Sequence, residues 1–249
     1  MDLNADVGQS FGSWSMGDDA SMLRLVSSAN VACGFHAGDP LTMLDSCRAA
    51  FDLDVRVGAH VGYPDLAGFG SRALDMSFDE LFCDVLYQLG ALDGVAHAVG
   101  ASVDYVRPHG ALYDRLVRDT EQAEAVVAAV HAYDPGLPAL GLPGSAWLTL
   151  AEEAGHPVFR EAFVDRAYNP DGTLVPRSQE GAVLQDSDDA VAQAVRLATR
   201  GEVVAHDGTV VAVEADSLWI HGDTPEALAM AGAVRKGLER AGVEIQAFA

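Results

Sequence analysis

The chain has 249 residues, of which 49% are hydrophobic and 21% are charged, and its 15 basic and 37 acidic side chains give a formal net charge of −22. This length fits one α/β barrel or two smaller domains, and the apolar fraction is sufficient for a full core, which excludes a disordered chain. The acidic charge argues against nucleic acid and membrane surfaces as partners, and no apolar run reaches the length of about 18 residues that a membrane span requires.

Short apolar runs alternate with amphipathic stretches along the whole chain, as in a protein of alternating strands and helices. The runs that predict buried strands are Met1–Asp6, Asn30–Cys33, Val55–Ala59, Asp104–Arg107, Pro138–Leu142, Pro157–Val164 and Ser217–Ile220. The stretches that predict helices are Asp18–Ser28, Pro40–Phe51, Ser77–Val99, Glu121–Tyr133, Ser145–Ala154, Ser187–Arg200 and Thr224–Ala241. An additional hairpin is predicted from Val203–Ala205 and Thr209–Val213, which flank Asp207-Gly208.

The predicted helices carry start signals, and the units are joined by short links. Asp39 precedes Pro40, and Ser77 is followed three residues later by Glu80, which is a capping box. Seven strand–helix units without a Pro/Gly/Ser-rich linker favour a single α/β domain over residues 1–249. The first residues have no basic segment before an apolar run, so we expect no secretory signal and a cytoplasmic location.

Six of the seven predicted strands lead into a histidine or an aspartate. These residues are, in chain order, Asp6, His36, His60, His109, Asp165 and His221. The other four histidines, His97, His131, His156 and His206, lie away from strand ends. In an α/β barrel the carboxyl ends of all strands converge on one mouth, so we expect the first set to lie together there.

This set of side chains supports two kinds of chemistry, and both stay open from the residues alone. One histidine after a strand is more often a hydrogen-bonded loop residue than a ligand, but four histidines and two aspartates at one mouth favour a functional site. Neutral imidazoles with a carboxylate bind divalent Zn, Fe, Mn or Ni. The same groups can act as general acids and bases.

Basic residues in the loops near this mouth form a second group. They are Arg72, Arg107, Arg166 and Arg177, the last of which is followed by Ser178. In so acidic a chain they predict a local anion site, although salt bridges to the many aspartates would explain at least one of them. The turn Gly141–Ser145 could present backbone N–H groups to a phosphate or be only a tight turn, and the chain contains no P-loop sequence.

Several longer motifs resemble those of the LamB/YcsF family, in order from Met1 to about Val243. They are Asp2–Asp6, Ser28–Asp39, Gly58–His60 through Gly70, Pro108–Tyr113, Phe163–Tyr168, Gly172–Ser178 and His221–Asp223. The resemblance implies a distorted seven-stranded parallel β/α (TIM-like) barrel similar to the glycoside hydrolase/deacetylase superfamily. It also implies ATP-dependent opening of 5-oxo-L-proline to L-glutamate, together with the B and C subunits of a bacterial 5-oxoprolinase.

The chain differs from the family's usual pattern at three positions. Gln9 stands where the family usually has Glu, Arg107 where it usually has Lys, and Asp114 where it often has Asn. Replacing Lys by Arg keeps the charge but exchanges a compact donor for a planar fork.

The positions of these residues at the predicted barrel mouth lead to specific expectations for the site. The expected catalytic residues are Asp6, His36, His60, His109 and Asp165, and the expected contacts to substrate or ATP anions are Arg72, Arg107, Arg166, Arg177 and Ser178. The alternative that the superfamily implies is a metal-dependent deacetylase or amidase, with Asp6, His36 and His60 as metal ligands and no need for ATP. A further alternative is a non-catalytic scaffold whose partner subunits perform the chemistry.

Overall fold

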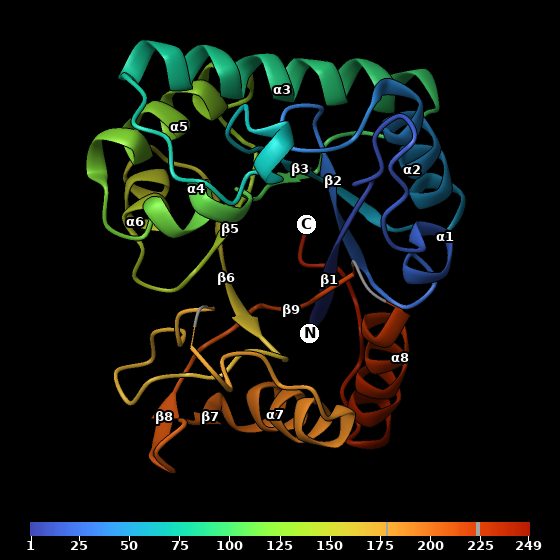
Figure 1. Ribbon diagram of the computed structural model, residues 1–249, viewed down its shortest axis with the longest axis vertical. Helices are drawn as coiled ribbons and strands as arrows, with labels where there is room; N and C mark the ends of the chain where they lie inside the picture. Colours follow the sequence, from blue (N-terminus) through green and yellow to red (C-terminus); the bar gives the residue numbers. More distant parts are fainter. Residues whose placement is uncertain (178, 223–224) are drawn as a thin grey trace.

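Seven parallel strands close into a barrel in the computed structural model, which describes residues 1–177, 179–222 and 225–249 (Figure 1). The strands are, in their order around the barrel, β1 (Asp2–Val7), β2 (Ser28–Ala32), β3 (Arg56–His60), β4 (Tyr105–Val106), β5 (Ala139–Gly141), β6 (Val158–Phe163) and β9 (Ser217–Ile220). β1 closes the barrel because it pairs on both sides, with Asn4 opposite Ser28 of β2 and Trp219 of β9. The predicted seven-stranded parallel barrel is confirmed.

The helices surround this barrel, as Figure 1 shows with α3 above it, α1 and α2 at one side and α7 and α8 below. They are α1 (Asp19–Met22), α2 (Pro40–Asp52), α3 (Phe78–Ala98), α4 (Gly110–Arg115), α5 (Thr120–Tyr133), α6 (Ala146–Glu153), α7 (Ser187–Arg200) and α8 (Pro225–Arg240), with a 3₁₀ turn at Leu66–Gly68. The predicted hairpin is confirmed as β7 (Glu202–Val204) and β8 (Val210–Ala212). Among the described residues, none of the helices has the length and apolar character needed to cross a membrane.

Two start signals that were predicted from sequence stabilise their helices. The Asp39 carboxylate accepts hydrogen bonds from the backbone N–H groups of Leu41 and Thr42, which have no partner inside the helix. Ser77 and Glu80 form the reciprocal capping box at the start of α3.

The helix predicted over Asp18–Ser28 is wrong in length, since α1 ends at Met22 and β2 already begins at Ser28. The reason is a pair of serines that bind the first strand. The Ser27 backbone N–H donates to the Leu3 carbonyl at 2.9 Å, and the Ser27 and Ser28 hydroxyls donate to the buried carboxylate of Asp2. Hydrogen-bonding serines at these positions favour strand β2 over another helical turn. The helix α4, directly after His109, was not predicted.

The barrel interior is polar, and this determines where the site lies. Leu3, Ala5 and Val7 of β1 belong to the apolar core between the strands and the helices. The alternate residues Asp2, Asn4 and Asp6 hydrogen-bond to side chains of other strands, as the two-residue period of a strand requires. Asp6, the last of the three, therefore lies at the carboxyl end of a polar column that opens toward the barrel mouth.

Candidate active site

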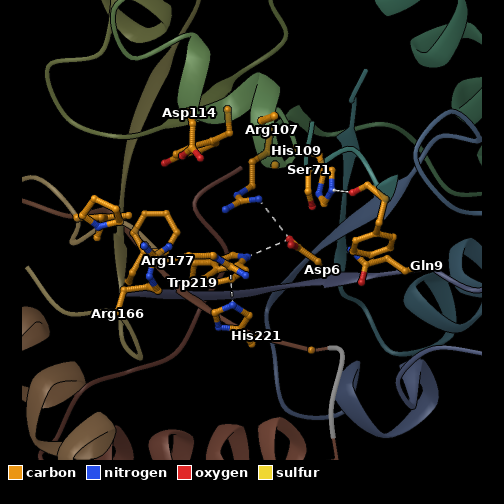
Figure 2. Close-up of a pocket in the computed structure, with 18 of the residues that line it drawn as sticks. Asp6, Gln9, Ser71, Arg107, His109, Asp114, Arg166, Arg177, Trp219 and His221 are labelled. Carbon is orange, nitrogen blue, oxygen red and sulfur yellow. Dashed lines mark hydrogen bonds and ion pairs between the residues drawn. The ribbon is translucent and has the colours of Figure 1, made fainter. Parts of the chain in front are cut away.

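A cavity of about 600 Å³ opens at the carboxyl ends of the strands (Figure 2). Of the predicted site residues, its lining includes Asp6, Arg107, His109, Arg166 and Arg177, together with His221. Asp165 lies beside His221, whereas His36 and His60 are fully buried beside His109. The structure thus brings the six predicted strand-end residues to one end of the barrel.

The Asp6 carboxylate is the point at which several elements meet. Its Oδ1 accepts hydrogen bonds from Asn30 Nδ2 at 2.9 Å, from Trp219 Nε1 at 2.9 Å and from Arg107 Nη1 at 3.3 Å. Its Oδ2 lies 3.3 Å from His60 Nε2. Burial by itself raises the pKa of Asp6, but the nearby His60 and Arg107 hold this pKa well below its usual value, so the group is a carboxylate.

Arg107, a predicted anion contact, is bound to carboxylates of the protein itself. Its Nε lies 2.7 Å from Glu161 Oε1 and its Nη2 2.8 Å from Glu161 Oε2, in a bidentate pair. Its guanidinium carbon lies 4.9 Å from the ring centre of Tyr113 and 5.2 Å from that of Trp219. Arg107 therefore forms part of the cavity wall with its charge already paired, and it positions Asp6.

Three histidines form a buried cluster directly behind this wall. The rings of His36 and His109 stack with centres 3.8 Å apart and planes at 8°, and the ring of His60 meets both edge-on. One nitrogen from each ring lies within 4.8 Å of the other two, which makes this a candidate metal site. The set differs from the predicted ligands Asp6, His36 and His60, because His109 takes the place of Asp6.

The electrostatics of the cluster fit a metal ion. Burial, together with the neighbouring histidines, lowers the pKa of His36 well below its usual value and that of His109 to about 3. Both imidazoles are therefore neutral at neutral pH, and neutral imidazole is the form that binds transition metals.

Asp165 and His221 form a second pair at the cavity. Arg177 extends this pair, and Figure 2 shows it near His221. Asp165 is buried and accepts a hydrogen bond from His221 Nδ1, while Arg177 Nη2 lies 2.6 Å from His221 Nε2. Because a guanidinium can only donate, Nε2 is the accepting nitrogen and the His221 proton is on Nδ1. The Nε2 lone pair of His221 thus lies on the cavity side, where it accepts the hydrogen bond from Arg177.

The other predicted anion contacts differ in position. Arg166 lines the cavity and donates to the carbonyl oxygens of Ala182 and Val175, so it also holds the loop that carries Arg177. Arg72 is exposed and pairs with Asp65, to which its Nε donates at 3.0 Å. Ser178 lies outside the described residues.

Because Arg72 already has a counter-ion, we expect Arg72→Gln to leave catalysis nearly unchanged. The Arg72 side chain is largely exposed, and it is not among the side chains that line the cavity. The KM for substrate in the assembled enzyme should change by less than about twofold. An increase in KM of about tenfold would instead show that Arg72 contacts the substrate.

Three functional candidates in or directly behind the cavity wall were not predicted from the sequence: Tyr113 and Trp219 line the cavity, and Glu161 is buried behind it. Glu161 binds Arg107, Trp219 donates to Asp6, and Tyr113 stacks under Arg107. For Glu161 and Trp219 the sequence signal is the two-residue period of a strand, since Glu161 lies two residues before Phe163 and Trp219 lies two residues before His221. Tyr113 lies on helix α4 and has no such signal.

Comparison with known proteins gives matches over the full length of the chain. The model of the LamB/YcsF family matches residues 1–249. A protein of Kocuria rhizophila, named as the A subunit of 5-oxoprolinase, is 57% identical over 249 residues, which cover 100% of this chain and 99% of that protein. A protein of the same name from Streptomyces coelicolor is 56% identical over 100% of both chains.

A solved structure gives the same result. The lactam utilization protein from Thermus thermophilus superposes with a TM-score of 0.96 at 49% identity, over 100% of this chain and 99% of that one. Sequence and architecture therefore agree along the whole molecule. This chain belongs to the LamB/YcsF family.

Proposed function

We propose that this chain is the A subunit of a cytoplasmic 5-oxoprolinase, which converts 5-oxo-L-proline to L-glutamate with hydrolysis of ATP to ADP and phosphate. The B and C subunits are its proposed partners. The observation that carries the proposal is identity of more than half of all residues, over the full length, with proteins named as the A subunit of 5-oxoprolinase. Because a fold alone does not determine function, the cavity must also offer the groups that the reaction needs.

The reaction itself explains why ATP is needed. A five-membered lactam is a poor electrophile, because amide resonance opposes attack and the leaving amine is basic. Transfer of the γ-phosphoryl group of ATP to the lactam oxygen would produce an activated imidate that water attacks readily. The protein must then supply positive charge for the phosphoryl group and a base for the water.

The cavity offers both groups within one site. We assign the anion contacts to Arg166 and Arg177, which line it from the loop after β6. One of them would bind the substrate carboxylate and the other would neutralise charge on the transferring phosphoryl group. Arg107, although it also lines the cavity, is assigned the structural task of holding Asp6 ionised beside the reacting atoms.

We assign the base to His221, with Asp165 as the group that orients it. The proton on Nδ1 is held by the buried Asp165 carboxylate, so Nε2 is available to take a proton from water. The hydrogen bond from Arg177 to Nε2 would be exchanged for an anion contact when substrate binds. The protonated His221 can then return its proton to the ring nitrogen as the C–N bond breaks, which leaves an acyl phosphate that a second water hydrolyses to glutamate and phosphate. Asp6 and His109 form the opposite part of the lining and would orient the lactam.

A second candidate function is a metal-dependent amidase that needs no ATP. The observation in its favour is the cluster of His36, His60 and His109, whose nitrogens are close enough to share one ion. Hydrolysis by a metal-bound water would predict amidase activity in the isolated chain.

The test is an assay of glutamate and phosphate release by the purified chain, with and without the B and C subunits. We expect both products in equal amounts only when ATP and all three subunits are present, because the lactam requires activation. Glutamate formed by the chain alone without ATP, and lost after chelation, would favour the amidase. Full turnover by the B and C subunits without this chain would show that this chain takes no part in catalysis.

A further inference from the structure

The outer face of helices α2 and α3 carries large apolar side chains for which the proposed reaction has no use. Seven such side chains are exposed in the described part of the chain, and four of them lie on these two helices: Leu41, Phe51, Phe78 and Tyr87. The two helices pack against each other, and Figure 1 shows α3 along the outer edge of the molecule. Single exposed apolar residues are ordinary, but a group of them on neighbouring elements marks an interaction surface. These four side chains define the α2–α3 face.

Tyr87 lies at the middle of this face, and 65% of the residue is exposed. Its ring stacks on that of Phe35, with the ring centres 5.4 Å apart and the planes at 26°. The two rings therefore form one apolar surface that extends from α3 to the loop after β2. Aromatic side chains of this kind are enriched in the cores of protein–protein interfaces, since a ring buries much area and loses little conformational freedom.

The same side of α3 contains two exposed glycines, which fit contact with another protein. Gly90 and Gly94 follow Tyr87 by three and seven residues, so the three positions lie on one side of the helix. A Cβ atom at either glycine would meet no atom of the described chain within 4 Å. Glycine destabilises a helix relative to alanine, and packing within this chain gives no reason for it here. Glycines on an outer face allow a second helix to approach closely.

The charges on the two helices distinguish a second copy of this chain from a different protein. Together α2 and α3 carry six acidic side chains and one basic one, Arg48. Two copies that met through this face would bring their acidic groups together, in chains that each have a formal charge of −22. Like charges brought together across an interface oppose association. A partner with an apolar centre and a basic margin would instead be complementary.

The α2–α3 face also lies close to the elements that support the cavity. Phe35 is followed directly by His36, whose ring stacks on that of His109, and His109 lines the cavity. A protein bound over Phe35 and Tyr87 would therefore contact the loop that supports the site. This position is the one expected for a subunit of the same enzyme.

We propose that the α2–α3 face, centred on Tyr87, binds the B and C subunits through an apolar segment of theirs that is flanked by lysines or arginines. The identity of this partner rests on the proposed function. The chemistry of the contact, with an apolar centre and an acidic margin on this chain, follows from the face itself.

The test measures the affinity of the full chain for the B and C subunits by sedimentation velocity, with ATP-dependent glutamate release recorded on the same samples. Tyr87→Lys removes the ring and places a positive charge against a basic partner, so the affinity should fall by about tenfold or more. The difference from the wild type should increase as salt is lowered, because screening decreases. The matched control is Val210→Lys, since Val210 is 51% exposed on β8 and Figure 1 shows β8 at the opposite end of the molecule from α3. It should bind as the wild type does.

Gly90→Leu is a second variant, which leaves the stacked rings of Phe35 and Tyr87 in place. Leucine favours a helix more than glycine does and has open space at this position, so the Tm of the chain should not fall. The added side chain would keep a partner helix at a distance, and the affinity for the B and C subunits should fall by about tenfold.

Unchanged affinity of both variants, in an enzyme whose wild type turns over 5-oxoproline, would overturn the proposed contact and leave the proposed function intact. A wild-type homodimer that Tyr87→Lys dissociates would also overturn it, because a second copy would then cover the face. A wild type that does not bind the B and C subunits would overturn both proposals. Binding that both variants weaken, without any turnover of 5-oxoproline by the wild-type complex, would support the contact and contradict the proposed function.

Discussion

Replacing Glu161 by glutamine is expected to lower the free energy of unfolding by about 3–5 kcal/mol. Glu161 forms the bidentate pair with Arg107, and both side chains are buried. Burial lowers the pKa of Arg107, whereas Glu161 and Asp6 raise it above its usual range. A guanidinium stays charged in proteins even without its partner. Within the described part of the chain, the variant would leave the buried Arg107 with Asp6 as its remaining paired carboxylate.

Urea unfolding at neutral pH measures this change in the free energy of unfolding. Two further variants show whether the change comes from the broken ion pair. Glu124→Gln, on the exposed face of α5, should leave the midpoint unchanged. The double variant Arg107→Met with Glu161→Leu removes both charges, so it should be more stable than Glu161→Gln alone. A loss of less than about 1 kcal/mol in Glu161→Gln would show that water or another group compensates Arg107.

The largest effect on catalysis is expected for His221→Gln, whose kcat in the assembled enzyme should fall by about 10²–10⁴-fold. Glutamine can keep a hydrogen bond to Asp165 but cannot take a proton from water. KM should change little, because the assigned anion contacts Arg166 and Arg177 remain. His131→Gln, on the exposed side of α5, is the matched control. A His221→Gln enzyme with kcat within about threefold of the wild type would require another base.

For a variant at His109, the stability of the fold must be measured together with the activity. Its place after β4 predicts a residue of the barrel mouth, and it does line the cavity. However, only 7% of the residue is exposed, and its ring packs against those of His36, His60 and Phe69. A His109→Ala variant would therefore lose packing as well as chemistry, and its activity is informative only per folded molecule.

Sequence periodicity predicts the barrel well because each strand and helix is defined by local signals. All seven strands occur where apolar runs lie, and the caps at Asp39 and Ser77 form as expected. The helix expected to continue to Ser28 does not, because Ser27 and Ser28 bind Asp2, which lies far away in the sequence. Contacts of this kind carry no local signal.

The same distinction explains which parts of the site could be predicted. The rule that strand ends converge brings Asp6, His109 and His221 to one cavity. Salt bridges were expected for at least one of the arginines, but the rule does not say which, so the pairs Arg72–Asp65 and Arg107–Glu161 could not be named. Arg107 and Glu161 lie on different strands, which the closed barrel brings together.

The central claim is that the lactam is opened in the cavity of this chain, and blocking that cavity tests it most directly. Ser71 lines the cavity and its side chain is exposed, so Ser71→Trp adds bulk there without disturbing the core. Ser102 is equally exposed but precedes β4, at the opposite end of the barrel, which makes Ser102→Trp the matched control.

The measurement is ATP-dependent glutamate release by each variant assembled with the B and C subunits, with assembly checked by size-exclusion chromatography. We predict that Ser71→Trp lowers kcat/KM by about tenfold or more, whereas Ser102→Trp leaves it unchanged. Equal kcat/KM for Ser71→Trp and the wild type, in fully assembled enzyme, would contradict this claim and move lactam opening to one of the partner proteins.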